Sequence, residues 1–140
     1  MGLKSSLDEI LKNIERAKRN TFTKKDVILV AATKTRSFNQ INQVYSLGIR
    51  HIGENRIQEA EGKFESFEEM PKITRRFIGH LQSNKINKFI KLFDTIDSID
   101  SYRLANKINT RIEQRKLTGL IEVNTSGDKN KKGFKPELSD

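Results

Sequence analysis

The stretch ILVAATKTRS, residues 28–37, decides how the rest of the sequence is interpreted. Its apolar part is short and rich in β-branched side chains, which predicts a strand over 27–32 and argues against a helix. Lys34 follows directly after this strand and Thr33. A lysine is costly to bury, which leaves two interpretations of Lys34. It is either an edge residue whose ammonium reaches solvent, or an amine in a site whose surroundings shift its pKa.

Capping patterns place helices on both sides of this strand. Ser6 and Glu9 have capping-box spacing, so a leading helix is expected to open at Ser6. Ser37 and Gln40 repeat the pattern, and Gly48 is a typical end for the helix that they open. Further helices are expected from 55, 83 and 101, and further strands over 49–53, 76–81, 95–99 and 118–123.

Strands and helices that alternate in this way predict an α/β fold with a parallel sheet and right-handed crossovers. Two architectures fit the pattern: an open doubly wound sheet, and a (β/α)8 TIM barrel cut short to about five β/α units. In both, ligand-binding groups gather at the carboxyl ends of the strands. We interpret residues 1–140 as one such domain with a leading helix.

Composition narrows the class of protein. The chain has 140 residues, of which 34% are hydrophobic and 32% charged, and its net charge is +9. There is no run of about 18 apolar residues, so no membrane span is expected. The lack of cysteine excludes disulfides and favours an intracellular, cytoplasmic location. The positive charges are spread along the chain and are not interleaved with aromatic residues, which disfavours a nucleic-acid platform.

Polar residues follow each of the five expected strands. Lys34 and Asn55 come after the first two strands, His80 and Ser98 lie at the next two strand ends, and Asn124 follows the last. Together they predict a polar mouth over an apolar floor. A lysine beside an apolar strand loses hydration, which lowers its pKa and favours the neutral amine that attacks carbonyl groups. From the residues alone, purely structural roles remain open for three of these positions. Lys34 can be a solvated lysine, His80 a packed histidine and Asn55 a helix cap.

Other chemistries lack their motifs. Neither GxGxxG nor GxxxxGK[ST] is present, so the phosphate-cradling nucleotide loops are absent. The sequence has no GxSxG nucleophile elbow. His51 and His80 are far apart, and neither begins a spaced metal cluster. A hydrolase is therefore not supported.

At the same strand ends the sequence resembles a known family, the YggS/PROSC family of pyridoxal 5′-phosphate (PLP) homeostasis proteins. The resemblance covers nearly the whole chain and rests on AATKT, HIGENRIQEA, FIGHLQSNK, IDSIDS and VNTSGDKNKKGF. It implies a barrel like that of alanine racemase, with PLP held as a Schiff base on the lysine after the first strand. Lys34 occupies that position. The resemblance also implies that Asn55 and His80 line the cofactor pocket, together with Ser98 and Asn124.

Small departures from the family pattern leave the amine in place. Ala32 and Thr33 stand where valine and serine are common, and Asp97 stands where histidine is frequent. The larger departure is length, since five of eight strands are expected here. Barrels of this type hold a phosphate with loops after the seventh and eighth strands. The sequence is therefore expected to represent the N-terminal part of such a barrel.

The family resemblance implies a PLP-binding protein that buffers PLP or delivers it to apo-enzymes, without established catalysis. It also implies a monomer for the full-length family. The spread of charge and the lack of a long apolar run predict neither a nucleic acid nor a membrane as partner. A racemase-like PLP enzyme is the main alternative, although it requires a second acid or base opposite Lys34. A remote alternative is a nucleic-acid-binding module that uses the lysines of one helix, Lys85, Lys88 and Lys91.

Overall fold

The computed structural model describes residues 2–23, 25–64 and 70–138. Its helices are α1 (Leu3–Arg19), α2 (Phe38–Ser46), α3 (Ile57–Phe64), α4 (Ile86–Leu92) and α5 (Tyr102–Asn109). Its strands are β1 (Val30–Ala32), β2 (His51–Glu54), β3 (Thr74–Phe77), β4 (Thr95–Ile99) and β5 (Thr118–Ile121). The described ranges also contain the short 3-10 helices η2 (Ser83–Lys85) and η3 (Pro136–Leu138).

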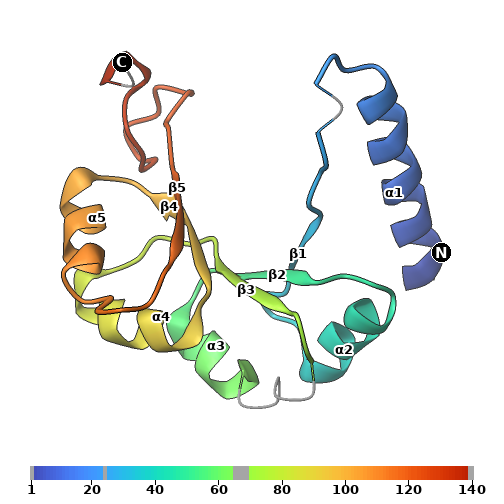
Figure 1. Ribbon diagram of the computed structural model, residues 1–140, viewed down its shortest axis with the longest axis horizontal. Helices are drawn as coiled ribbons and strands as arrows, with labels where there is room; N and C mark the ends of the chain where they lie inside the picture. Colours follow the sequence, from blue (N-terminus) through green and yellow to red (C-terminus); the bar gives the residue numbers. More distant parts are fainter. Residues whose placement is uncertain (1, 24, 65–69, 139–140) are drawn as a thin grey trace.

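The strands form one parallel sheet in the order β1-β2-β3-β4-β5. The predicted α/β fold with a parallel sheet is therefore confirmed. A doubly wound sheet reverses its strand order at a switch point, and this sheet follows the chain order from one edge to the other. Figure 1 shows α2, α3, α4 and α5 along one side of the curved sheet, with β1 and β5 at its two edges.

The core lies between the sheet and these helices. Phe77 of β3 packs edge-to-face on Phe89 and Phe93, with ring centroids 5.7 and 5.2 Å away. Phe64 of α3 makes a similar contact with Phe93 at 5.2 Å. Such aromatic pairs add to the free energy gained by burying their area. Ile86 and Phe89 turn one face of α4 into this core. Phe93, the residue after α4, is buried there too and stacks on Phe89.

Three local predictions match the structure closely. Ser37 caps α2 in a capping box with Gln40, and Gly48 follows the helix with a φ of 98° that favours glycine. Ser101 caps α5 by accepting a hydrogen bond from the Leu104 amide. β4 spans Thr95–Ile99, as expected. These elements depend on local spacing, which the sequence displays directly.

The predicted start of the leading helix is wrong. Ser6 lies inside α1, which begins at Leu3 and has Gly2 at its N-cap. Leu3 lies one turn before Leu7 on the same face of α1, and the Ser6 amide donates to the Gly2 carbonyl at 3.1 Å, so the helical hydrogen bonds begin before Ser6. The apolar spacing from Ile57 to Phe64 also predicts Phe67 as part of the helix expected from 55, and Phe67 lies outside the described residues.

Strand lengths also differ from the prediction. β1 begins at Val30, and the apolar residues Val27 and Ile28 before it are 56% and 58% exposed. The pairing of β1 with β2 begins at Val30 and His51, so Val27 and Ile28 have no partner residue in β2. β3 ends at Phe77, four residues earlier than expected.

The amino ends of β3 and β4 carry a charged cluster, Arg75, Asp94 and Arg115, which we call the amino-end cluster. The guanidinium of Arg75 donates to both carboxylate oxygens of Asp94, at 3.0 and 2.9 Å, and the Arg75 amide donates at 2.8 Å. Arg115 donates to Asp94 at 3.1 Å and to the Phe93 carbonyl at 2.6 Å. Burial alone would raise the pKa of Asp94, but the hydrogen bonds from Arg75 outweigh it and hold that pKa below its usual value.

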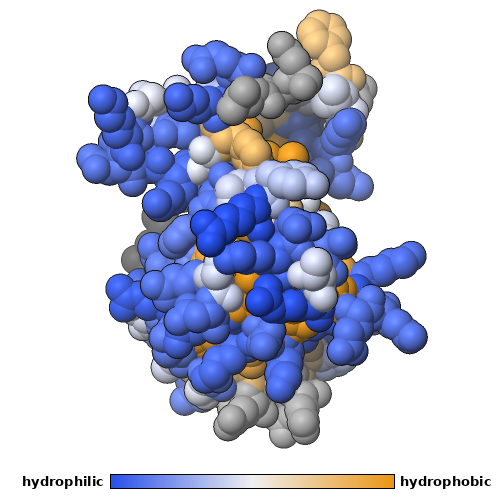
Figure 2. All heavy atoms as spheres, turned by 90° about the vertical axis from the view of Figure 1, so that its left-hand side faces the viewer, coloured by the Kyte–Doolittle hydropathy of each residue, from blue (hydrophilic) through white to orange (hydrophobic). Residues whose placement is uncertain are grey.

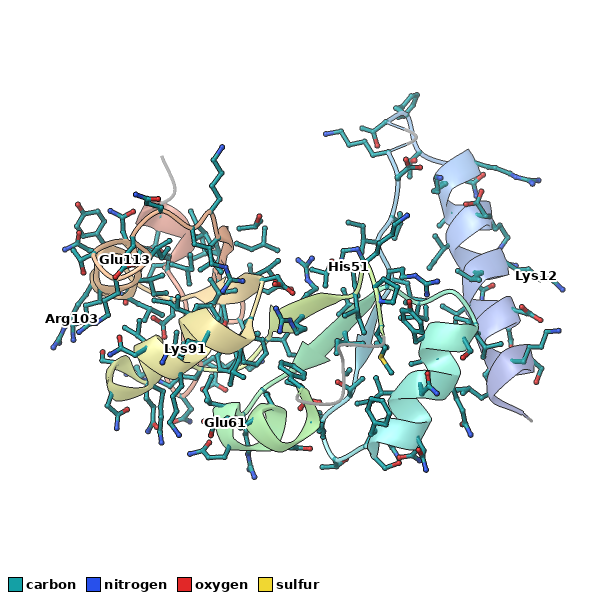
Figure 3. The ribbon with its side chains drawn as sticks, turned by 60° about the horizontal axis from the view of Figure 1, so that its bottom comes forward. Lys12, His51, Glu61, Lys91, Arg103 and Glu113 are labelled. Atoms are coloured by element: carbon teal, nitrogen blue, oxygen red, sulfur yellow. The ribbon has the colours of Figure 1, made fainter. Side chains whose placement is uncertain are left out.

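A second polar layer connects the start of β2 with the interiors of β3 and β4. Arg76 donates to both carboxylate oxygens of Asp97, at 2.8 and 2.9 Å, and lies 3.5 Å from Nδ1 of His51. In Figure 3 His51 lies over the sheet, whereas Glu61 and Lys91 project from the outer sides of α3 and α4. Burial lowers the pKa of His51, and the positive charge of Arg76 lowers it further.

The surface over the helices is charged. Figure 2, which faces the side of the molecule that carries α5, shows mostly hydrophilic atoms with apolar atoms visible between them. Lys88, one of the three lysines of the nucleic-acid alternative, is paired with Glu61 at 2.8 Å. Within the described ranges, no helix is long and apolar enough to cross a membrane.

Candidate functional site

The carboxyl ends of β3, β4 and β5 enclose a cleft of about 300 Å³, which we call the carboxyl-end cleft. Three of the five predicted site residues line it: His80, Ser98 and Asn124. Lys131 and Lys132 line it as well and add positive charge. Lys34 and Asn55, the other two predicted residues, are not among its lining side chains. The predicted polar mouth is therefore divided, with one group at β3 to β5 and another at β1 and β2.

Gly79 connects the two groups. A Cβ atom at this position would overlap the backbone of Asn55, so only glycine permits the chain after β3 to approach the end of β2 so closely. On its other side, the carbonyl of Gly79 accepts a hydrogen bond of 2.5 Å from the buried hydroxyl of Ser98. Asn55 and Ser98 are thus held on opposite sides of one backbone segment.

His80 and Asp100 form a hydrogen-bonded pair in this region. Nδ1 of His80 lies 2.9 Å from the Asp100 carboxylate, and Ser101 donates to the other oxygen of Asp100 at 3.0 Å. The His80 side chain remains 51% exposed, whereas Asp100 is 10% exposed. The carboxylate therefore orients an imidazole whose other nitrogen can meet a ligand or solvent.

Asn124 makes hydrogen bonds within the loop that follows β5. Its amide nitrogen donates to the Asp128 carbonyl at 2.8 Å, and its amide oxygen accepts from the backbone and hydroxyl of Ser126, at 3.2 and 2.9 Å. These contacts fold the loop after β5 and bring Lys131 and Lys132 to the cleft. Asn124 therefore shapes the wall of the carboxyl-end cleft from within the loop.

Lys34 lies in a turn directly after β1 and is exposed. We expected the neighbouring strand to remove water from its ammonium, and this expectation is wrong. β1 ends at Ala32 and the buried residue at this end is Thr33, so the chain has left the sheet before it reaches Lys34. The next residue, Thr35, has a φ of 62°, a conformation that is unfavourable for a β-branched side chain.

A cluster of three charged residues supports this turn: Glu54, Glu59 and Lys63, which we call the carboxyl-end cluster. The ammonium of Lys63 donates to Glu54 at 2.8 Å and to Glu59 at 2.7 Å. Burial alone would lower the pKa of Lys63, but these hydrogen bonds outweigh it and raise that pKa. The pKa of Glu59 is lowered, first by the hydrogen bond from Lys63 and then by the one from the Thr35 amide.

The sequence contained a partial signal for this cluster. Glu59 and Lys63 have the i, i+4 spacing of a helical ion pair. Glu54 gave no such signal, because a carboxylate after a strand is ordinarily solvated, whereas here it has no exposed surface. Lys131 and Lys132 were visible only as part of a lysine-rich loop.

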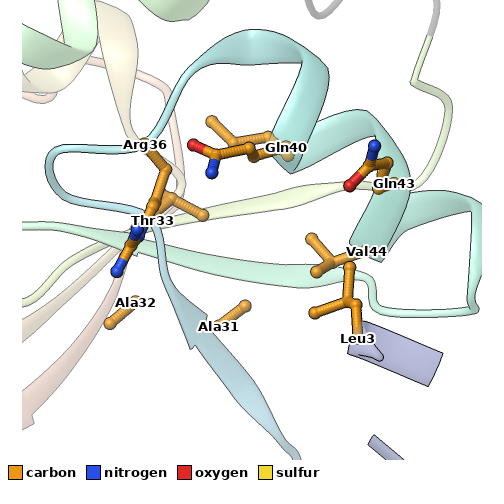
Figure 4. Close-up of a pocket in the computed structure, with 9 residues that line it drawn as sticks. Leu3, Ala31, Ala32, Thr33, Arg36, Gln40, Gln43 and Val44 are labelled. Carbon is orange, nitrogen blue, oxygen red and sulfur yellow. The ribbon is translucent and has the colours of Figure 1, made fainter. Parts of the chain in front are cut away.

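A larger cavity of about 390 Å³ lies on the helix side of β1 (Figure 4). Alkyl groups of Leu3, Ala31 and Val44 line it, with Gln40 and Arg36 at its border. None of the five predicted site residues lines this cavity. It also offers no cluster of titratable groups, so we place the candidate site at the carboxyl ends of the strands. Among the residues that the structure describes, no group of three or more acidic, histidine or cysteine side chains could hold a metal ion.

A parallel α/β sheet with polar groups along its carboxyl edge is a common ligand-binding arrangement. Comparison with curated proteins identifies the pyridoxal phosphate homeostasis protein of Synechocystis, 39% identical over 113 residues, which are 79% of this chain and 52% of that protein. The pyridoxal phosphate homeostasis protein of Helicobacter pylori is 33% identical over 141 residues, covering 98% of this chain and 63% of that protein. The chain thus spans less than two thirds of these relatives. No model of a protein family matches it.

Solved structures give the same result. PipY of Synechococcus elongatus, solved with PLP bound, has a TM-score of 0.71 and 31% identity, covering 86% of this chain and 58% of PipY. A protein of unknown function from Bifidobacterium adolescentis has a TM-score of 0.82 and 36% identity over 96% of this chain and 59% of its own. These similarities confirm the resemblance to the YggS/PROSC family, and the chain is homologous to the corresponding part of these proteins.

Proposed function

We propose that this chain binds PLP covalently through Lys34 and takes part in PLP homeostasis. The observation that carries the proposal is its similarity to PipY, a protein solved with PLP bound, over 86% of this chain. Lys34 supports it locally, because a primary amine lies exposed at the carboxyl end of β1, where ligands of parallel α/β sheets bind.

The side chains at this edge suit such a ligand. PLP supplies an aldehyde that condenses with a primary amine and releases water, in a reaction that reverses on hydrolysis. His80, oriented by Asp100, and the lysines of the carboxyl-end cleft offer donors to the anionic and phenolic oxygens of PLP. Asn55 and Ser98 both contact Gly79, the glycine after β3. They therefore shape the boundary between the carboxyl-end cleft and the end of β2.

We further propose that the five β/α units are part of a (β/α)8 barrel of the alanine racemase type. Two observations support this proposal. The strand order follows the chain, as in a barrel, and the TM-score to the longer Bifidobacterium adolescentis protein is 0.82. β1 and β5 would then be the edges at which further strands pair. The whole of residues 1–140 would form one barrel segment.

The role proposed for PLP binding is buffering or delivery to apo-enzymes, without catalysis. Racemases need a second acid or base at the substrate carbon. The two tyrosines are not placed for this task, since Tyr45 donates to the Pro71 carbonyl and Tyr102 lies exposed at the start of α5. Incubation of the PLP-loaded protein with L-alanine in deuterated water should give no exchange of the α-proton, and rapid exchange would favour the racemase alternative.

Borohydride trapping tests the covalent link. The protein is mixed with PLP and reduced, and the labelled peptide is identified by mass spectrometry. We expect the label on Lys34 and its loss in Lys34→Ala, with Lys91→Ala as the matched control because Lys91 is an exposed lysine on α4. A label that stays in Lys34→Ala at the same level, or the absence of any label in the wild type, would refute the proposal.

A further inference from the structure

We infer that Lys63 and Glu59 position Lys34 by binding the peptide groups before and after it. Glu54 supports them by accepting hydrogen bonds from Lys63 and from the Thr33 hydroxyl. The inference rests on the proposed function, in which Lys34 carries PLP. In this inference the three residues fix the position of Lys34, in addition to stabilising helix α3. They are positioning residues, since none of them is proposed to contact PLP.

The first contact holds the peptide group before Lys34. The Thr33 carbonyl, which belongs to this peptide, accepts a hydrogen bond of 2.8 Å from the Lys63 ammonium. The Thr33 hydroxyl donates to Glu54 at 2.7 Å, and its amide donates to the Gly53 carbonyl at 2.9 Å. Thr33 is therefore bound to β2 and α3 through its carbonyl, hydroxyl and amide.

The second contact holds the peptide group after Lys34. The Thr35 amide, which belongs to this peptide, donates to the Glu59 carboxylate. Thr35 has the unfavourable φ of 62°, so a charge-assisted hydrogen bond at this amide favours a conformation that the residue otherwise avoids. Lys63 joins the two contacts because it also donates to Glu59, at 2.7 Å.

Burial argues for a fixed geometry in this cluster. Glu54 is completely buried, and one of its carboxylate oxygens, Oε2, has no hydrogen-bond partner. A buried ion pair of this kind is weak evidence for stability, because desolvation offsets much of its attraction. What the cluster does provide is a rigid set of charges on β2 and α3, with hydrogen bonds aimed at the turn that carries Lys34.

The sharpest test is at Glu59, which is partly exposed on α3 and can be replaced without leaving a buried cavity. Glu59→Ala removes the acceptor of the Thr35 amide, whereas Glu59→Gln keeps an amide oxygen in its place. Glu61→Ala is the matched control, since Glu61 lies two residues further along the same helix and pairs with Lys88. Amide hydrogen exchange at Thr35 and the apparent affinity for PLP are measured in all four proteins.

We expect Glu59→Ala to exchange the Thr35 amide about tenfold faster and to bind PLP about tenfold more weakly, as for the loss of one charge-assisted hydrogen bond. Glu59→Gln should lie between it and the wild type, and Glu61→Ala should match the wild type. If the wild type captures PLP but Glu59→Ala keeps either wild-type exchange or wild-type affinity, this inference alone is overturned. A wild type that captures no PLP refutes the proposed function and this inference with it.

Discussion

Two charged clusters lie at opposite ends of the same sheet, and they differ in what they hold. The amino-end cluster joins Arg75, Asp94 and Arg115 and binds the backbone at the end of α4 and the start of β3. The carboxyl-end cluster joins Glu54, Glu59 and Lys63 and binds the turn that contains Lys34. The first connects elements of the fold to each other, and the second connects the fold to a candidate functional residue.

This difference follows the general behaviour of parallel α/β proteins, in which the amino ends of the strands serve stability and the carboxyl ends carry the site. Changes in the amino-end cluster should therefore alter stability and spare the affinity for PLP. Changes in the carboxyl-end cluster should alter the site, and they should alter stability only where a buried charge loses its partner.

The largest effect is expected for Lys63→Met. It leaves the fully buried carboxylate of Glu54 without its cation, which typically destabilises a protein by about 3–5 kcal/mol. Urea unfolding monitored by circular dichroism measures the loss. The double variant with Glu54→Gln and Lys63→Met removes both charges, so it should recover most of the stability. A double variant as unstable as Lys63→Met would show that the buried charge is not the cause.

A smaller effect is expected for Asp94→Asn in the amino-end cluster, a loss of about 1–2 kcal/mol from weakened charge-assisted hydrogen bonds. Because the pKa of Asp94 is lowered in the folded state, its contribution is present above the ordinary carboxyl pKa and is lost as the pH falls through the lowered value. The gap between wild type and variant in urea unfolding should therefore close in acid. PLP affinity at neutral pH should stay unchanged, and a clear fall in affinity would contradict the division between the two clusters.

The smallest effect is expected for His51, the first residue of β2, whose ring lies beside Arg76. Its pKa is lowered in the folded state, so the unfolded chain binds a proton more readily and stability falls as the pH drops below the usual histidine pKa. His51→Gln should remove this dependence, which we expect to amount to about half a kcal/mol or less. The measurement is the free energy of unfolding of the wild type and of His51→Gln between about pH 7 and 5. If it changes with pH equally in both proteins, His51 does not contribute to the pH dependence.

Much of the fold could be predicted because its signals are local. The capping box at Ser37, the glycine end at Gly48 and the whole of β4 are determined by residues within one turn or strand of each other. The predicted start of α1 was wrong because the helix continues for one turn before Ser6. There the Ser6 amide donates to the Gly2 carbonyl, and Gly2 is the N-cap without a side-chain cap, so the sequence offers no capping pattern at the true start.

The candidate site was predictable in part for the same reason. The positions of His80, Ser98 and Asn124 at successive strand ends placed them in one cleft. The exposure of Lys34 was not predictable, because it depends on where β1 leaves the sheet. The burial of Glu54 was missed too, since it requires Lys63 to fold back from α3 onto the end of β2.

The strand order also bears on how the sheet can assemble. Among the described residues, each strand pairs with its neighbours in the chain, so the sheet runs in sequence order from β1 to β5. Pairing two neighbouring strands closes a connection of one loop-and-helix unit, which costs less loop-closure entropy than pairing strands from opposite ends of the chain. The order of the strands in the sheet is thus also the order in which they leave the ribosome, from β1 to β5.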